Sequence, residues 1–222
     1  MWTILALMAF GVLAIILFIK LQRPEGMSNV MDECRVLRKE IRDDMTIEIV
    51  DADCKEGLPH TTGPYTVRMT EAAWAHQRRD TTLMHEHVHL EQKRKPLEWY
   101  EWYRRYWDYE LLTTPPPDLP TKYVVGLRPN PDTADAPWAL WRHRWLFFPN
   151  YVDAERTLRN ARVLVWDTSM KTIVDVPSAW KDTFCDGLIC PHQYEHPHEL
   201  SAEYIADGSA SIAANKLYEW RK

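Results

Sequence analysis

The most apolar stretch of the chain lies at its start, where residues 2–19 (WTILALMAFGVLAIILFI) contain no charged side chain. A helix of this length would extend roughly 27 Å, which is close to the thickness of the hydrocarbon layer of a bilayer. A cleaved signal peptide is the alternative, but no basic residue precedes the run, and residues 20–23 (KLQR) offer no small-residue cleavage site. The pattern therefore predicts a transmembrane anchor in residues 1–22, which contacts the lipid bilayer through residues 2–19.

Two basic residues set the expected orientation of this anchor. Lys20 and Arg23 follow the apolar run, whereas only the α-amino group precedes it. Because the cytoplasmic flanks of membrane helices are enriched in Lys and Arg, we expect a single-pass membrane protein whose soluble domain is cytoplasmic. Residues 23–222 are long enough to form one domain with its own hydrophobic core.

The first part of this domain contains patterns of both helices and strands. Apolar residues recur at helical spacing within residues 31–43, so we expect a helix there. Residues 45–50 and 65–69 are short runs with β-branched side chains, which predict strands. A longer helix is predicted for residues 81–94, with the preceding Asp80 as its N-cap.

The second part begins with residues 97–112, whose large aromatic side chains repeat at a spacing that places them on one helical face. We expect this face to pack behind the preceding helix. Stacking on nucleobases is the alternative, but acidic residues interrupt any basic surface there. Strands in a meander or a β-rich subdomain and a last helix from His198 to about Leu217 are also expected, the strands being residues 145–148, 163–166 and 172–176. Separate runs of helices and strands predict an α+β fold.

Charge and cysteine content restrict the possible partners. The chain has 27 Lys and Arg against 32 Asp and Glu, a formal net charge of −5. No overall basic field would attract DNA or RNA, so nucleic acid is not an expected partner. The 4 cysteines are compatible with reduced thiols and equally with two disulfides. Cys185, Cys190 and His192 are a weak candidate for a second metal site, because their spacing is not that of a zinc finger or ribbon.

The motif with the clearest chemical meaning is residues 85–89 (HEHVH), an HExxH sequence within the helix predicted for residues 81–94. Histidines at i and i+4 project from one helical face, so the imidazoles of His85 and His89 can reach one Zn²⁺ ion. Zinc lowers the pKa of its bound water towards 7, and Glu86 can accept that proton as general base while the hydroxide attacks a carbonyl group. The motif therefore predicts metal-assisted hydrolysis.

Two other structures can contain the same five residues. One is a solvated helix rich in histidine. The other is a strand on which His85, His87 and His89 share one face, as in a cupin-type barrel. No acidic ligand follows at the spacing of a cupin, and the chain has only 7 glycines. The uncharged residues on both sides of the motif favour a buried helix, although Glu91 departs from that pattern.

A catalytic zinc ion needs a third protein ligand and leaves its fourth position for water. Glu199, Glu203 and Asp207 lie at i, i+4 and i+8 along the last predicted helix, beside small residues that would permit close approach to the HExxH helix. Either Glu199 binds the metal and Glu203 orients a ligating histidine, or Glu203 binds the metal and Asp207 orients the histidine. Glu199 is preferred because it directly follows the His-Pro start of the helix. A solvated acidic face is the alternative for the whole set.

An HExxH motif with a distant glutamate helix resembles the gluzincin branch of the zinc metallopeptidases. Residues 203–207 (EYIAD) resemble the ligand segment of membrane CAAX-processing-type proteases, but those proteins have several spans and this chain has one predicted span. Residues 196–199 (HPHE) with Ala202 resemble uncharacterised zincin-like proteins of large DNA viruses and algae, a similarity that includes residues 130–133 (NPDT) and loosely covers residues 80–207. This resemblance implies a zincin-like fold with an HExxH active-site helix and a C-terminal glutamate helix. It also adds the virion interior as a location for the domain.

The resemblance further suggests how a substrate would bind. Gluzincins often stabilise the oxyanion of the reaction with a Tyr, His or Arg side chain, and His192, Tyr194 and Tyr204 are candidates near the glutamate segment. The predicted strand at residues 65–69 is the candidate edge strand along which an extended substrate would pair.

Three functions are compatible with these features. The leading one is a membrane-anchored zinc metallopeptidase that hydrolyses a peptide or protein substrate, with His85, His89 and Glu199 on zinc and Glu86 as general base. The second is a catalytically silent zincin-fold structural or interaction protein of a virion or membrane complex. The third is a metal-binding module unrelated to zincins, in which His85 and His89 would lie far from both glutamates of the last helix.

Overall fold

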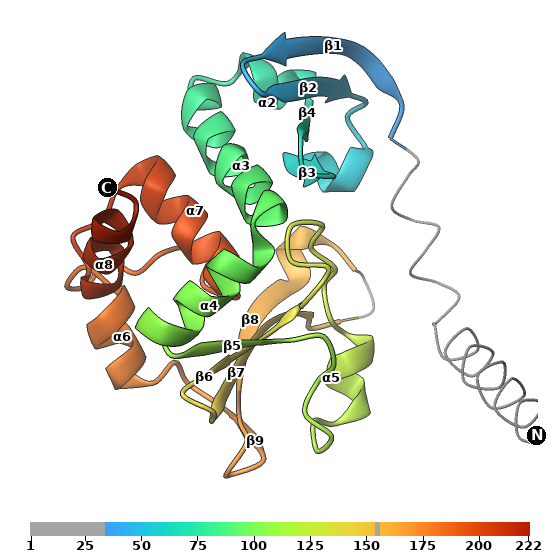
Figure 1. Cartoon of the computed structure of the whole chain (residues 1–222). Coiled ribbons are helices and arrows are strands. Elements are labelled where there is room, and N and C mark those ends of the chain that lie inside the picture. Colours follow the sequence, from blue (N-terminus) through green and yellow to red (C-terminus); the bar gives the residue numbers. More distant parts are fainter. Residues whose placement is uncertain (1–33, 154–155) are drawn as a thin grey trace, which may run out of the picture. The chain divides into compact units, whose positions relative to one another are not determined.

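The computed structural model describes residues 34–153 and 156–222. Helices combine with two separate sheets, so the described chain has the α+β fold that the sequence predicts (Figure 1). The predicted transmembrane segment, residues 2–19, lies outside the described residues. Within the described ranges, no helix has both the length and the apolar character needed to cross a bilayer.

The first sheet contains four strands in the order β1-β2-β4-β3. The central pair, β2 and β4, is parallel, and each outer strand is antiparallel to its neighbour. The strands β2 and β4 confirm the two strands predicted in this region. The elements are β1 (Val36–Arg42), β2 (Met45–Val50), the 3-10 helix η1 (Cys54–Gly57), β3 (His60–Thr62) and β4 (Thr66–Thr70).

The prediction of a helix within residues 31–43 is wrong, because β1 occupies the described part of this segment. Exposure alternates from residue to residue along β1, which is the period of a half-exposed strand. A two-residue turn at Asp43 and Asp44, with a φ of 49° at Asp43, returns the chain onto β2. Pairing with β2 outweighs the local helical spacing, because it gives the backbone N–H and C=O groups hydrogen-bond partners.

The helix that carries the HExxH motif, α3 (Arg79–Arg94), packs on one face of this sheet. It follows α2 (Glu71–Ala75) and buries Leu83 and Leu90 against apolar side chains of β2 and β4, namely Ile47, Ile49, Val67 and Met69. The prediction of Asp80 as the N-cap is wrong, because α3 begins earlier and its N-cap is Arg78. Asp80 lies in the first turn of the helix. Its negative charge near the N-terminus still interacts favourably with the helix dipole.

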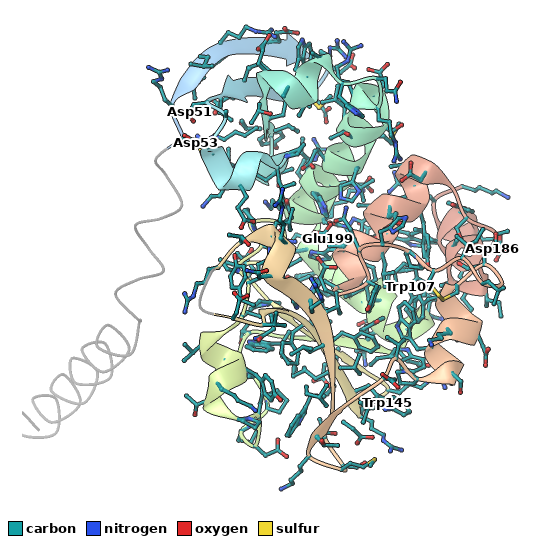
Figure 2. All side chains as sticks on the ribbon, turned by 180° about the vertical axis from the view of Figure 1, so that it is seen from behind. Asp51, Asp53, Trp107, Trp145, Asp186 and Glu199 are labelled. Carbon is teal, nitrogen blue, oxygen red and sulfur yellow. A yellow bond between two sulfur atoms is a disulfide. The ribbon has the colours of Figure 1, made fainter. Side chains whose placement is uncertain are left out.

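The predicted aromatic helix ends earlier than its spacing suggests. α4 (Pro96–Tyr106) is followed at Asp108, where φ is 58°, by the strand β5 (Tyr109–Leu112). The expected packing of its aromatic face is confirmed, since Trp99, Trp102 and Tyr103 are buried in the same core as Val88 of α3. Trp107 lies in the interior next to this helix (Figure 2), and its indole N–H donates to the carbonyl oxygen of Ala213 at 3.1 Å.

The second sheet is an antiparallel meander of five strands in chain order, from β5 to β9, which confirms the predicted meander. The short helix α5 (Thr121–Val125) follows the proline-rich connector. The remaining elements of this part are β6 (Trp138–Trp141), β7 (Trp145–Tyr151), the 3-10 helix η2 (Leu158–Asn160), β8 (Ala161–Asp167) and β9 (Thr172–Val174).

The last predicted helix is divided in two. α7 (Pro197–Asp207) ends at Gly208, whose φ of 83° is readily available only to glycine. α8 (Ile212–Trp220) then begins after Ser211, whose hydroxyl caps the new helix. The break separates the helix that carries Glu199 from a C-terminal helix that contributes to the aromatic core.

The candidate second metal site is wrong. Cys185 and Cys190 form a disulfide directly after α6 (Ser178–Phe184). Only a free thiolate is a good metal ligand, so these two sulfur atoms cannot bind an ion with His192 while the bond is intact. The bond closes a short loop in which the backbones of Asp186 and Ile189 pair with each other.

A buried aspartate at the end of β8 generates a prediction on stability. Asp167 accepts two hydrogen bonds from the Arg144 guanidinium, at 2.9 and 2.7 Å, and others from Ser169 and the Met170 N–H. The Arg144 interaction, opposed by burial, holds the pKa of Asp167 below its usual range. We expect Asp167→Asn to lower the free energy of unfolding at pH 7 by about 1–3 kcal/mol.

The pH dependence of this loss has a defined sign. A depressed pKa adds stability above the pKa of an unfolded aspartate, about 3.9, and the contribution disappears as the pH falls through the lower folded value. Urea unfolding from pH 7 to pH 2 should therefore show wild type and Asp167→Asn converging only in acid. The control is Asp182→Asn, on the exposed face of α6. A difference that persists unchanged at pH 2 would contradict the prediction.

Candidate metal centre

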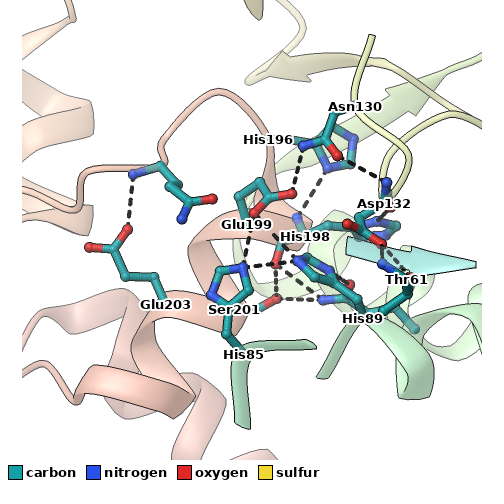
Figure 3. Close-up of polar contacts among 12 residues, drawn as sticks. Thr61, His85, His89, Asn130, Asp132, His196, His198, Glu199, Ser201 and Glu203 are labelled. Carbon is teal, nitrogen blue, oxygen red and sulfur yellow. Dashed lines mark hydrogen bonds and ion pairs between the residues drawn. The ribbon is translucent and has the colours of Figure 1, made fainter. Parts of the chain in front are cut away.

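Three side-chain atoms that could bind a metal lie close together, two from α3 and one from α7. His85 Nε2 lies 3.0 Å from His89 Nε2, and Glu199 Oε2 lies 3.2 Å from the first and 3.4 Å from the second (Figure 3). These residues form a group that could hold a metal ion. The structure thus brings together three of the residues that the sequence singles out as metal ligands.

The distances between these atoms suit a small tetrahedral ion. Four ligands at about 2.0–2.1 Å from a tetrahedral centre are separated from one another by about 3.3 Å. The three measured separations, 3.0, 3.2 and 3.4 Å, are close to that value. The donor set of two imidazoles and one carboxylate also fits such an ion and leaves a fourth position for a water molecule.

Local sequence explains why the two helices supply these atoms. His85 and His89 are one turn apart on α3, so both imidazoles project towards α7. On α7, Ser201 and Ala202 are fully buried, and their small side chains allow the close approach that brings Glu199 to the histidines. His196 caps the start of α7 by accepting a hydrogen bond from the backbone N–H two residues later.

Burial and charge perturb each ionisable group of the centre. Burial opposes the charged form of His89, but the charges of Glu199 and Asp132 raise its pKa to about 10. Burial also opposes the charged form of Glu199, yet the charge of His89 and hydrogen bonds from both histidines hold its pKa well below the usual range. Glu199 is therefore an anion in this environment, which is the state that binds a cation.

The expected general base lies in the same buried environment. Glu86 is 4% exposed, and burial, followed by the negative charge of Asp132, raises its pKa well above the usual range. Its Oε2 atom is buried and has no hydrogen-bond partner among the described residues. An unsatisfied buried carboxyl oxygen is costly, so this atom is available to accept or donate a hydrogen bond within the centre.

A residue that the sequence analysis missed fixes the orientation of His89. Gln92 donates from its amide nitrogen to the carbonyl oxygen of His198 and to Ser201 Oγ, so its Oε1 atom must face His89. That oxygen accepts a hydrogen bond from His89 Nδ1 at 2.7 Å. The proton on Nδ1 leaves the lone pair of Nε2 free for a metal. The signal was present in the sequence, because Gln92 follows His89 by three residues on one helical face.

Glu203 and Asp207, expected as a ligand or as residues that orient a histidine, are placed elsewhere. The Glu203 carboxylate accepts hydrogen bonds from the backbone N–H groups of His192 and Gln193, both at 2.9 Å. Asp207 forms an ion pair with Arg78. Neither carboxylate belongs to the group of ligand atoms around His85, so Glu203 is not in a ligand position and the orienting role falls to Gln92.

Of the three candidates for oxyanion stabilisation, Tyr204 has its hydroxyl group in a structural hydrogen bond. The hydroxyl of Tyr204 donates to the carbonyl oxygen of Phe184, and the ring of Tyr194 packs against Trp180 at 5.6 Å between centroids. The backbone N–H of His192 is bound to Glu203. These contacts give no reason to choose any of the three as a group that binds substrate.

The expected substrate edge is also different. The strand at residues 65–69 corresponds to β4, which lies between β2 and β3 and is therefore not an edge strand. The edge next to α3 is β3, where the Thr61 N–H donates to Asp132 Oδ1 and the Thr61 carbonyl accepts from Lys93 Nζ, both at 3.1 Å. The outward-facing backbone groups of Thr61 are thus already paired within the domain.

Comparisons of the chain with protein families, with curated proteins and with solved structures found no match.

The two competing glutamates generate a direct prediction. We expect Glu199→Ala to weaken zinc binding by more than the roughly 10–100-fold that outer partners of a metal site contribute. Glu203→Ala should leave the zinc affinity unchanged and lower only the stability of the fold, because the Glu203 carboxylate accepts hydrogen bonds from two backbone N–H groups. Competition with a chromophoric chelator measures both affinities. Equal losses in the two variants would contradict the assignment of Glu199.

A second prediction concerns Gln92. Gln92→Leu should weaken zinc binding about 10–100-fold, because His89 loses the acceptor that fixes its tautomer. Gln92→Glu keeps an acceptor at the same distance and should retain more affinity than Gln92→Leu. The matched control is Gln77→Leu, an exposed position just before α3. Wild-type affinity in Gln92→Leu, measured by the same chelator competition, would rule out the orienting role.

Proposed function

We propose that this chain is a zinc-dependent metallopeptidase of the gluzincin type, in which His85, His89 and Glu199 hold the zinc ion. The observation that carries the proposal is the convergence of their three ligand atoms within 3.4 Å of one another. Glu86 adjoins the first ligand in sequence, and its buried Oε2 atom has no hydrogen-bond partner within residues 34–153 and 156–222, which supports its role as general base.

The fold is compatible with this proposal. The resemblance to zincin-like proteins implies an HExxH helix and a later helix that supplies a glutamate ligand. Here α3 carries the HExxH motif and packs on the first sheet, and α7 supplies Glu199. The proposed zincin-like fold rests on this arrangement.

The chemistry requires few groups from the protein. A bound zinc ion would lower the pKa of a water molecule and polarise the carbonyl group of a peptide bond. Glu86 would accept the proton of that water and deliver it to the leaving amine. His85 and His89 would bind the ion as neutral imidazoles, so His89, whose pKa is raised to about 10, would release a proton as the metal binds, with its orientation fixed by Gln92.

Because the proposed reaction is hydrolysis of a peptide bond, the substrate would be a peptide or a protein. We further propose that residues 1–22 anchor the domain to a bilayer on its cytoplasmic or virion-interior side, a proposal that rests on the apolar sequence of residues 2–19 alone.

A second candidate is a zincin-fold structural or interaction protein of a virion or membrane complex that binds metal without turnover. The burial of the centre favours it, since the side chains of His85, His89 and Glu199 are only 15%, 1% and 3% exposed. The paired backbone of Thr61 at the edge strand points the same way, because an extended peptide cannot add to β3 there.

The experiment that separates the two candidates combines metal analysis with peptide cleavage. We expect about one zinc per chain, and we expect cleavage of a library of unstructured peptides followed by mass spectrometry. Glu86→Gln should retain the zinc and lose activity by about 10²–10⁴-fold, the usual contribution of a general base. Glu91→Gln, on the same helix and paired with Arg221, is the matched control.

Each outcome assigns a function. Cleavage by wild type that survives intact in Glu86→Gln would end the proposed mechanism. Stoichiometric zinc without cleavage in wild type would favour the structural protein. A wild-type chain that binds no zinc would contradict both.

A further inference from the structure

The structure treats the two oxygen atoms of Glu199 differently. Oε2 lies 3.2 Å from His85 Nε2 and 3.4 Å from His89 Nε2, on the side of the proposed metal. Oε1 accepts a hydrogen bond from Nδ2 of Asn130 at 2.8 Å (Figure 3). One oxygen is therefore offered to the metal, and the other is held by a side chain from a distant part of the sequence.

The orientation of the Asn130 amide follows from its second contact. The backbone N–H of Asp132 donates to Asn130 Oδ1 at 2.9 Å, and an N–H group can pair only with the oxygen end of an amide. The nitrogen end, which is a donor, must then face Glu199. Donation to the carboxylate favours its charged form, which is the form that binds a cation.

The loop that carries Asn130 is fixed to three elements. Asp132 Oδ1 accepts hydrogen bonds from the Thr61 N–H of β3 at 3.1 Å and from Lys93 Nζ of α3 at 3.0 Å. The carbonyl oxygen of Asp132 accepts from Nδ1 of His198 on α7 at 3.2 Å. Because the loop is already ordered by these contacts, Asn130 loses little conformational freedom when it binds Glu199.

We infer that Asn130 is a positioning residue of the metal centre, which holds Glu199 as a ligand through one oxygen only. The inference rests on the proposed zinc site. Without Asn130 the carboxylate can rotate until both oxygens approach the metal. The coordination number would then rise, and the second oxygen would occupy the position that a water molecule needs.

The test uses Asn130→Ser. A serine hydroxyl can still accept the Asp132 N–H in the same type of turn, but it is too short to reach Glu199. Co²⁺ serves as a probe in place of zinc, because its visible absorption weakens as the coordination number rises above four. We expect a weaker and shifted Co²⁺ absorption in Asn130→Ser, together with about 10–100-fold weaker zinc binding. Asn130→Ala should behave in the same way, and it serves if the serine variant does not fold.

Two controls separate positioning from general damage. Asn150→Ala removes a different asparagine, which is buried and whose amide donates to the carbonyl oxygen of Tyr123 at 2.8 Å, and should leave the Co²⁺ spectrum unchanged. Asn130→Ser added to Glu199→Ala should cause no further loss of zinc affinity, since the carboxylate that it positions is already absent.

The outcomes distinguish this inference from the function on which it rests. If wild type binds both ions and Asn130→Ser and Asn130→Ala keep the wild-type spectrum and affinity, the positioning role is wrong while the metal site remains. A further loss in the Glu199→Ala background would also overturn it, since Asn130 would then act by another route. A wild-type chain that binds neither ion overturns the metal site itself.

Discussion

The burial of the Glu199 carboxylate between α3 and α7 is the constraint on which the rest of the centre depends. A carboxylate that is only 2% exposed would become neutral unless nearby groups compensated its charge. His85 and His89 provide that compensation, and they can do so only if α7 approaches α3 closely. The small, fully buried side chains of Ser201 and Ala202 permit this approach. The metal-ligand geometry is thus a consequence of helix packing.

The sequence contained the local half of this arrangement. Periodicity placed the HExxH motif on a helix and predicted two strands of the first sheet, β2 and β4, and three of the second, β7 to β9, because these patterns depend on neighbouring residues. The choice between Glu199 and Glu203 was only a preference, since both lie on α7 one turn apart. That choice depends on which turn of α7 crosses α3, which is a property of the tertiary structure. The orienting role of Gln92 was recognisable from its spacing on α3 and was overlooked.

Elements that depend on distant partners were predicted less well. The segment at β1 has apolar residues at helical spacing and also alternates, and only its pairing with β2 decides between the two. The aromatic helix ends at Tyr106 for the same reason, because the residues after Asp108 pair with β6. Asn130 could not be placed beside Glu199 from the sequence at all, since 69 residues separate them. Tertiary pairing overrides local propensity at these positions.

The loop of residues 130–132 links the metal centre to the edge of the first sheet. Asp132 occupies the outward N–H of Thr61 on β3, and its own backbone N–H holds the Asn130 amide against Glu199. A peptide that paired with β3 at Thr61 would have to displace Asp132, and the support of Asn130 would be weakened at the same time. Ligand geometry and access to the edge strand are therefore not independent in this domain. For turnover, either this loop would have to move, or the substrate would have to reach the metal without pairing with the backbone of Thr61.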